Sequence, residues 1–207
     1  MKPIAIVGRA CVLPGALSPQ ALWQALLDGR DLTQSVRDLP GSRWGLAPAQ
    51  VLCSPDQPVA DRCWTDRGAF VSGFEEIWNP HGFLLDAQQL TGLDPLLHWT
   101  LHCAREALSA VADVACAKAQ PCPAADSVGH AALSPSYGSA RVGAVLGNLG
   151  FPSASMAAFA HQVWSGKPTG DPRNRHMSGG TAALLAQALG LNAGSYCLDA
   201  ACASALY

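Results

Sequence analysis

The chain has 207 residues, of which 49% are hydrophobic and 14% are charged, and its formal net charge is −2. So low a charged fraction predicts a folded protein with a large buried surface and argues against disorder. A nearly neutral chain without a basic cluster argues against a nucleic-acid partner. No apolar stretch is long enough to span a bilayer. Because Gly8 and Arg9 interrupt the apolar run that a signal peptide needs, we expect a cytoplasmic protein.

The cysteines are scattered along the chain. They form neither a C-x-x-C pair nor a cysteine–histidine cluster with zinc spacing. In a reducing compartment such cysteines are most simply free thiols. We therefore expect no metal site built from them.

The first predicted element is a strand over residues 3–8, because the run PIAIVG is continuously apolar and ends in glycine. Such a run is typical of a strand buried on both faces of a parallel sheet. A helix is predicted next, with Ser18 as N-cap and Pro19 in its first turn, and Gly29 ends its apolar stripe. The intervening GRACVLPG lacks the glycine pattern of a phosphate-binding loop, which argues against nucleotide binding.

The middle of the chain predicts a loop, a short strand and a long helix. Residues 46–68 show no hydrophobic period and predict the loop, and residues 68–73 predict the strand. The helix begins with Asp94 as N-cap and Pro95 in the first turn. Its apolar residues recur at spacings of four and three and define one buried face. These residues are Leu97, Leu101, Ala104, Leu108 and Val111.

The polar side chains of this helix lie off the apolar face. His98, His102 and Glu106 lie one turn apart, a spacing that could hold a metal ion. The motif H-E-x-x-H is missing, however, and no further carboxylate has helical spacing. A solvated or interfacial helix face is therefore the more ordinary interpretation.

The second half of the chain predicts one irregular segment followed by strands and helices. Residues 117–140 are dominated by alanine, proline, serine and glycine and predict a surface insertion, because long irregular connections are unusual inside a compact domain. Residues 141–147 predict a second buried strand, residues 155–164 a helix, and residues 178–189 a helix ended by Gly190. Strands that alternate with helices in this way predict an α/β fold with a mostly parallel sheet.

The last stretch combines a strand with a reactive side chain. An apolar run from Tyr196 to Leu198 is followed by Asp199 and then by small residues around Cys202. This pattern predicts a nucleophile on a tight turn between a strand and a helix. Free N–H groups at a helix start near Cys202 would stabilise its thiolate. The alternative is that Cys202 is a small buried hydrophobic residue, as free cysteines often are.

The sequence DAACASALY resembles the active-site signature of β-ketoacyl synthases, which reads Asp-x-Ala-Cys-x-Ser-Ser-Leu. Ala205 stands where this signature has its second serine, a change between two small residues. By this resemblance Cys202 is the catalytic residue that carries the acyl chain. The matching residues are Asp199, Ala201, Cys202, Ser204 and Leu206.

Further stretches extend the resemblance over nearly the whole chain. The opening IAIVGRACVLPGALSPQALWQALLDGRD and the later Arg43-Trp44 are similar to modular ketosynthases. The residues from Asn174 to Tyr207 are similar to ketosynthases of polyunsaturated fatty acid synthases. Leu96 to His98 depart from the Gln-Gln-Arg that usually follows Asp-Pro in the family, at a place that often contributes to its dimer surface.

The resemblance implies a thiolase-like fold, in which helices and sheets are layered α-β-α-β-α and two similar halves pack together. Residues 1–207 correspond to the first half, truncated just after the nucleophile. The catalytic histidine and lysine residues of the family lie beyond the nucleophile, and the histidines here stand in neither family context. The resemblance therefore assigns a catalytic role to Cys202 alone.

The implied activity is that of a β-ketoacyl-[acyl carrier protein] synthase fragment. Its parent enzyme performs a decarboxylative Claisen condensation through an acyl-Cys intermediate in fatty acid or polyketide biosynthesis. The implied partners are an acyl carrier protein and a second ketosynthase fold, in a homodimer or a heterodimer. No cofactor is expected to bind directly, since phosphopantetheine arrives on the carrier protein.

Three alternatives to this activity stay open. The first is a non-catalytic subunit of the chain-length-factor type, which shares the fold but typically lacks the cysteine. The second is an inert half-domain. The third is a cysteine hydrolase, which requires a catalytic triad that the sequence does not show.

Overall fold

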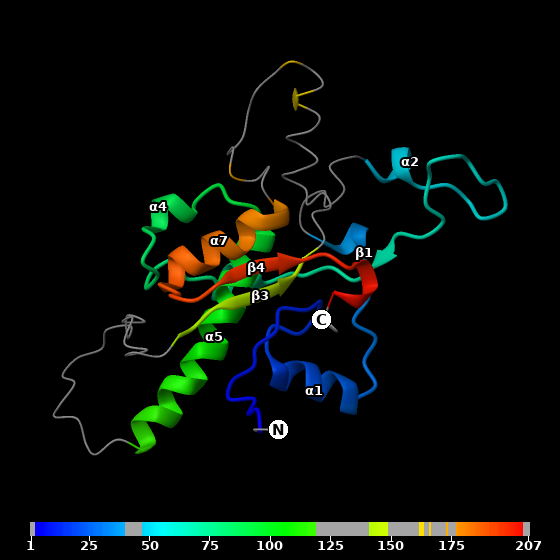
Figure 1. Ribbon diagram of the computed structural model, residues 1–207. Coiled ribbons are helices and arrows are strands. Elements are labelled where there is room, and N and C mark those ends of the chain that lie inside the picture. Colours follow the sequence, from blue (N-terminus) through cyan, green and yellow to red (C-terminus); the bar gives the residue numbers. More distant parts are fainter. Residues whose placement is uncertain are drawn as a thin grey trace. The chain divides into compact units, whose positions relative to one another are not determined.

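The computed structural model describes residues 3–39, 47–118, 141–148, 162–163, 166, 173 and 177–204. The chain divides into two compact units, one formed by Ala10–Ile77 and the other by Met1–Arg9 with Trp78–Tyr207. Each unit is taken by itself below, and Figure 1 identifies their helices and strands by label and colour. Among the helices that the structure describes, none combines the length and apolar character that a membrane span requires.

In the unit Ala10–Ile77, the helix α1 (Pro19–Leu27) begins and ends where the sequence predicts. The side chain of Ser18 accepts a hydrogen bond from the N–H of Ala21 at 3.2 Å, and Pro19 occupies the first turn. Gly29 has a φ of 62°, in the left-handed region that a glycine adopts without steric cost. Local cap chemistry is therefore sufficient to place this helix.

The other elements of this unit are short. They comprise the strand β1 (Gln34–Ser35), the 3-10 turn η1 (Val36–Asp38), the helix α2 (Pro48–Val51), the strand β2 (Arg67–Gly68) and the helix α3 (Phe74–Ile77). The predicted loop over residues 46–68 thus contains the short helix α2 as well as an isolated bridge between Leu52 and Cys63.

The strand predicted over residues 68–73 is wrong beyond its first residue, because β2 ends at Gly68. In the antiparallel register of β1 with β2, Gly68 faces Gln34, so that residue 69 would have to face Thr33. The N–H of Thr33 instead donates to Asp31 Oδ1 at 2.9 Å. This side-chain turn takes the donor that a longer ladder would need.

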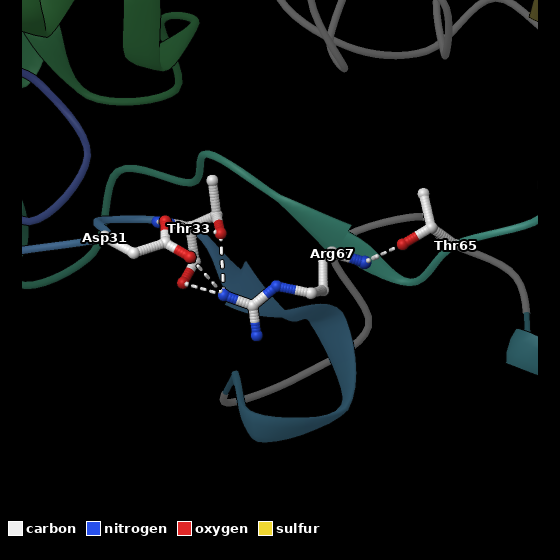
Figure 2. A network of polar contacts seen from close by, with 4 residues as sticks. All are labelled: Asp31, Thr33, Thr65 and Arg67. Atoms are coloured by element: carbon white, nitrogen blue, oxygen red, sulfur yellow. Dashed lines mark hydrogen bonds and ion pairs between the residues drawn. The ribbon is translucent and has the colours of Figure 1, made fainter.

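A polar network lies beside the β1–β2 pair (Figure 2). Arg67 Nη2 donates to Asp31 Oδ2 at 2.8 Å, to Thr33 Oγ1 at 2.7 Å and to the Thr33 carbonyl at 3.1 Å. The hydrogen bonds from the N–H and the hydroxyl of Thr33, followed by the charge of Arg67, lower the pKa of Asp31. Just before β2, Asp66 accepts from Ser35 Oγ at 2.8 Å and from Arg37 Nε, in the turn after β1, at 3.0 Å.

The unit that contains Trp78–Tyr207 is built on two longer helices and one parallel strand pair. Its main elements are α4 (Ala87–Leu90), α5 (Pro95–Lys118), β3 (Ala144–Gly147), α7 (Met177–Leu189) and β4 (Ser195–Leu198). Helix α7 packs against both strands and against α5, as Figure 1 shows. The predicted helix ended by Gly190 is confirmed, since Gly190 has a φ of 66°.

Helix α5 also begins as predicted, because Asp94 Oδ1 accepts the N–H of Leu96 at 2.9 Å and Pro95 follows the cap. Its predicted apolar face is buried at Leu97 and Leu101, with exposed fractions of 4% and 1%. The seven buried residues of this core join α4, α5 and α7. They are Leu90, Leu93, Leu97, Leu101, Leu185, Ala188 and Leu189.

The strands β3 and β4 pair in parallel, as an α/β fold predicts, with Ala144 opposite Ser195 and Gly147 opposite Leu198. The strand predicted from residue 141 begins at Ala144 instead. Just before it, Val142 donates its N–H to Asn192 Oδ1 at 2.9 Å, a side chain in the loop that leads into β4. The described part of the chain therefore shows one parallel and one antiparallel strand pair.

The strand predicted over residues 3–8 is not formed. Ile4 and Ile6 have exposed fractions of 96% and 90%, and no described strand pairs with this segment. The segment contacts α5 at Gly8, where an added Cβ would lie 1.9 Å from the Ala107 carbonyl oxygen. An apolar run carries strand propensity, but a strand needs a partner ladder to satisfy its backbone groups.

The polar side of α5, interpreted from the sequence as a solvated or interfacial face, is packed at His98 and His102 and exposed at Glu106. The ring of His98 stacks on Trp78 with centroids 4.7 Å apart, and its Nε2 lies 2.9 Å from the Leu90 carbonyl oxygen. His102 is buried, and this burial lowers the pKa of its imidazole. Across the described residues, no group of three or more His, Cys, Asp or Glu side chains is placed to share a metal ion.

Arg105 completes this packed side of α5. Its Nη1 donates to the Asn79 carbonyl at 2.7 Å and to the His81 carbonyl at 3.1 Å. The guanidinium carbon also lies 4.8 Å from the ring centroid of Phe83. One side chain thus holds the segment before α4 against the helix.

Two sequence predictions fall largely outside the described residues. Of the predicted surface insertion over residues 117–140, the structure describes Ala117 and Lys118, which end α5. Of the helix predicted over residues 155–164, it describes residues 162–163, which are helical.

Substituting Arg105→Ala removes two hydrogen bonds to carbonyl oxygens and the contact with Phe83. Because charged hydrogen bonds and cation–π contacts are each worth on the order of 1–2 kcal/mol, we expect a loss of about 2–3 kcal/mol in unfolding free energy. Urea titration followed by tryptophan fluorescence measures it. Glu106→Ala is the control: it removes only the exposed ion pair with Arg105 Nε at 3.9 Å and should cost less than about 1 kcal/mol. Equal losses in both variants would contradict the packing role of Arg105.

Substituting Thr33→Val or Arg67→Gln should raise the pKa of Asp31. The lowered pKa means that the folded state favours the carboxylate, so that this contribution to stability is present above the unfolded-state pKa. It is lost as pH falls through the folded-state pKa. Carboxyl NMR titration of Asp31 in both variants measures the shift, and Asp66 provides the internal control because its own partners, led by Ser35, are untouched. An unmoved Asp31 midpoint in both variants would rule out the side chains of Thr33 and Arg67 as causes of the shift.

Candidate active site

The residues that follow β4 form the tight turn that the sequence predicts. Strand β4 ends at Leu198, and the 3-10 turn η3 (Ala201–Ala203) places Cys202 at its centre. Cys202 is exposed in this chain, whereas the alternative interpretation of a small hydrophobic residue expects it to be buried. Residues 205–207, over which a following helix was expected, lie outside the described residues.

The turn contains a strained backbone position immediately before the cysteine. Ala201 has a φ of 48°, a left-handed conformation that residues with a Cβ avoid. Its N–H donates to Asp199 Oδ1 at 3.2 Å. Ser204 Oγ accepts the N–H of Ala200 at 2.9 Å and donates to the Ala201 carbonyl at 2.8 Å. Two signature side chains, Asp199 and Ser204, therefore hold the strained turn.

The end of β3 supports this turn from the neighbouring strand. Asn148 donates its N–H to the Leu198 carbonyl at 3.0 Å, and its Nδ2 lies 3.4 Å from Thr181 Oγ1 of α7. An added Cβ at Gly147 would lie 3.2 Å from both Cβ and the carbonyl oxygen of Ser204. The cysteine turn thus lies at the carboxyl ends of two parallel strands, where α/β folds place their sites.

Neither Gly147 nor Asn148 was a sequence candidate. The sequence marked Gly147 as the end of an apolar strand and gave no reason for its size. One sequence pattern could have indicated them: a glycine ends one predicted strand, and small residues directly follow another. Recognising it requires the parallel register, which pairs residues 51 positions apart.

The site offers a nucleophile and a backbone donor. Among the described residues, none accepts a hydrogen bond from the N–H of Cys202. Within the same part of the chain, no histidine, lysine or arginine side chain makes a hydrogen bond to residues 199–204. A hollow of about 180 Å³ between α5 and α7 is lined by Leu97 and Leu184 but not by Cys202. A general base therefore remains unassigned.

Gly147→Ala should disturb the cysteine turn, because its new Cβ contacts Ser204 at a distance tighter than ordinary packing. We expect a loss of about 1–3 kcal/mol in unfolding free energy and a changed rate of Cys202 alkylation by iodoacetamide. Gly179→Ala in α7 is the matched control, since an added Cβ there has no atom within 4 Å. A Gly147→Ala protein as stable and as reactive as the wild type would disprove the close contact.

Comparisons with known proteins agree with this geometry. A sequence profile described as "Beta-ketoacyl synthase, N-terminal domain" matches residues 1–207. Mycoketide-CoA synthase of Mycobacterium tuberculosis is 37% identical over 108 residues, which are 51% of this chain and 2% of that protein. A mycocerosic acid synthase-like polyketide synthase of the same species is 26% identical over 207 residues, covering 100% of this chain and 8% of the relative. This chain therefore spans a small part of the curated relatives it matches.

Solved structures show the same relationship. The structure titled "PfaC Keto synthase-Chain length factor" matches 98% of this chain and 21% of its own, with a TM-score of 0.72 and 29% identity. The oxazolomycin ketosynthase domain OzmH KS7 of Streptomyces albus covers 97% of this chain with a TM-score of 0.62, and at 17% identity it supports the fold alone. The chain has the fold of a ketosynthase N-terminal domain and belongs to the β-ketoacyl synthase N-terminal domain family.

Proposed function

We propose that this chain is the nucleophile-bearing part of a ketosynthase domain and that Cys202 forms the acyl-enzyme intermediate of a decarboxylative condensation. The observation that carries the proposal is the exposed Cys202 on a strained turn held by Asp199 and Ser204. An exposed thiol with a backbone N–H donor on the same residue fits a covalent acyl carrier. Membership of the family supports the same role.

The first half-reaction is an exchange of thioesters. The Cys202 thiolate attacks the carbonyl carbon of an acyl group bound to the phosphopantetheine thiol of a carrier protein. The N–H of Cys202 donates to the oxyanion that forms, where a donor lowers the barrier most. Collapse of the tetrahedral intermediate breaks the original C–S bond, and the released phosphopantetheine thiolate takes up a proton. The acyl group is then bound to Cys202. The polypeptide itself binds no cofactor in this proposal, since phosphopantetheine arrives on the carrier protein.

The second half-reaction forms the carbon–carbon bond. A malonyl-type extender loses its carboxylate as carbon dioxide, and the remaining electron pair attacks the carbonyl carbon of acyl-Cys202. The Cys202 thiolate leaves, which restores the free enzyme. Donors that stabilise the enolate are needed for this step, and by family resemblance they are histidine and lysine residues beyond Cys202.

The proposed partners are an acyl carrier protein and a second ketosynthase fold. The likeness to a structure that contains a keto synthase and a chain length factor supports such a pairing. It also supports the proposal that residues 1–207 form the first half of a layered α-β-α-β-α domain. A chain-length-factor-type subunit is the second candidate function, because the same structure contains one; the exposed Cys202 favours the catalytic subunit.

Cys202→Ala should abolish acylation. Incubation of the natural polypeptide that contains this chain with an acyl carrier thioester should add one acyl mass to the wild type, mapped by peptide mass spectrometry to Cys202. Cys197→Ala, which removes a thiol from β4 without touching the turn, should leave this mass gain intact. Acylation that persists in Cys202→Ala would show that the nucleophile lies elsewhere. A wild type without any mass gain would favour the non-catalytic subunit.

A further inference from the structure

The hydroxyl of Ser204 connects two backbone groups on either side of Ala201. It accepts a hydrogen bond from the Ala200 N–H at 2.9 Å and donates one to the Ala201 carbonyl at 2.8 Å. A serine hydroxyl has one hydrogen to donate, and this contact uses it. The Ser204 side chain is therefore committed to the turn and is not a free acid or base for substrate.

This contact fixes the peptide that joins Ala201 to Cys202. A trans peptide is planar, and its N–H points away from its C=O. Whatever holds the Ala201 carbonyl therefore also sets the direction of the Cys202 N–H. The Ala201 carbonyl is held twice by Ser204, through the hydroxyl at 2.8 Å and through the Ser204 N–H at 3.2 Å.

Ser204 is itself held in place by a residue outside the turn. The backbone of Gly147 at the end of β3 lies so close to Ser204 that an added Cβ would be 3.2 Å from the Ser204 Cβ. Ala201 has a strained, left-handed φ of 48°. Without the hydrogen bond from the Ser204 hydroxyl, the backbone at Ala201 can therefore relax to a less strained conformation. The strain of a left-handed alanine and the contribution of one hydrogen bond are of the same order. Removing the Ser204 hydroxyl therefore takes away the hydrogen bond that offsets the backbone strain at Ala201, the residue before the nucleophile.

We infer that Ser204 is a positioning residue for acyl transfer. Its hydroxyl holds the Ala201–Cys202 peptide so that the Cys202 N–H is aimed at the oxyanion formed on the thioester carbonyl. This inference rests on the proposed role of Cys202 as the acylated nucleophile. Ser204 acts through the backbone, because its hydroxyl bonds to the Ala200 N–H and to the Ala201 carbonyl.

The test compares two chemistries at the same thiol in the natural polypeptide that contains this chain. Acylation of Cys202 by an acyl N-acetylcysteamine thioester passes through an oxyanion, whereas alkylation by iodoacetamide does not. Quenched-flow mass spectrometry gives kcat and KM for acylation, and alkylation rates are measured across a range of pH. The variants are Ser204→Ala, which removes the hydroxyl, and Ser204→Thr, which keeps it. Ser195→Ala is the matched control, because it deletes a serine hydrogen bond to the Ala144 N–H at the other end of the same strand pair.

If Ser204 is a positioning residue, its loss slows the acylation of Cys202 but not its alkylation. Ser204→Ala should lower the kcat of acylation by about tenfold to a hundredfold, the range seen when a catalytic group is misplaced. Its KM, its alkylation rate and the pH midpoint of alkylation should stay close to those of the wild type. Ser204→Thr should restore kcat, and Ser195→Ala should match the wild type in every measurement.

Three results would overturn the inference. The first is a wild-type kcat in Ser204→Ala. The second is an equal loss of acylation and alkylation, which marks a purely structural role. The third is a Ser204→Thr protein that melts like the wild type without recovering kcat. Wild-type protein that is not acylated at Cys202 would instead refute the proposed function, and the inference would fall with it.

Discussion

The parallel pairing of β3 with β4 is the constraint on which the site depends. Because Gly147 lies opposite Leu198, the two strands end at the same level, and the residues that follow them meet. Asn148 extends the ladder by one hydrogen bond to Leu198, and the missing side chain of Gly147 leaves space for Ser204. The turn that presents Cys202 is thus built from two segments that are distant in sequence. Helix α7, packed on both strands, keeps them in register.

Small residues around Cys202 have two separate physical roles. They let the backbone turn sharply after β4, and they leave the thiol exposed. The left-handed Ala201 costs about 1–2 kcal/mol, whereas three hydrogen bonds from Asp199 and Ser204 side chains each return about 0.5–1.5 kcal/mol. The polar side chains therefore balance the strain, which explains why an alanine is tolerated where a glycine would fit more easily.

Features decided by local chemistry were predictable from the sequence, and features decided by distant partners were not. The caps at Ser18 and Asp94 act within one turn and correctly placed α1 and α5. The position of Cys202 on a turn after a strand was likewise predictable, because it depends on a few adjacent residues. The run at residues 3–8 looks like a strand but has no ladder to join among the described residues. Packing of Arg105 against residues around Asn79 and the closeness of Gly147 to Ser204 depend on contacts that no local pattern encodes.

Dissolved salt should act in opposite directions on the surface ion pairs and on the apolar contacts of this chain. The Asp31–Arg67 and Asp66–Arg37 pairs beside β1 and β2 are exposed, and mobile ions screen such charges over a Debye length of about 8 Å at physiological ionic strength. The other unit depends on an apolar core between α4, α5 and α7, which salts such as sulfate strengthen because they are excluded from the protein surface. Ionic composition therefore weakens the ion pairs beside β1 and β2 while it strengthens the apolar core of the unit that carries Cys202.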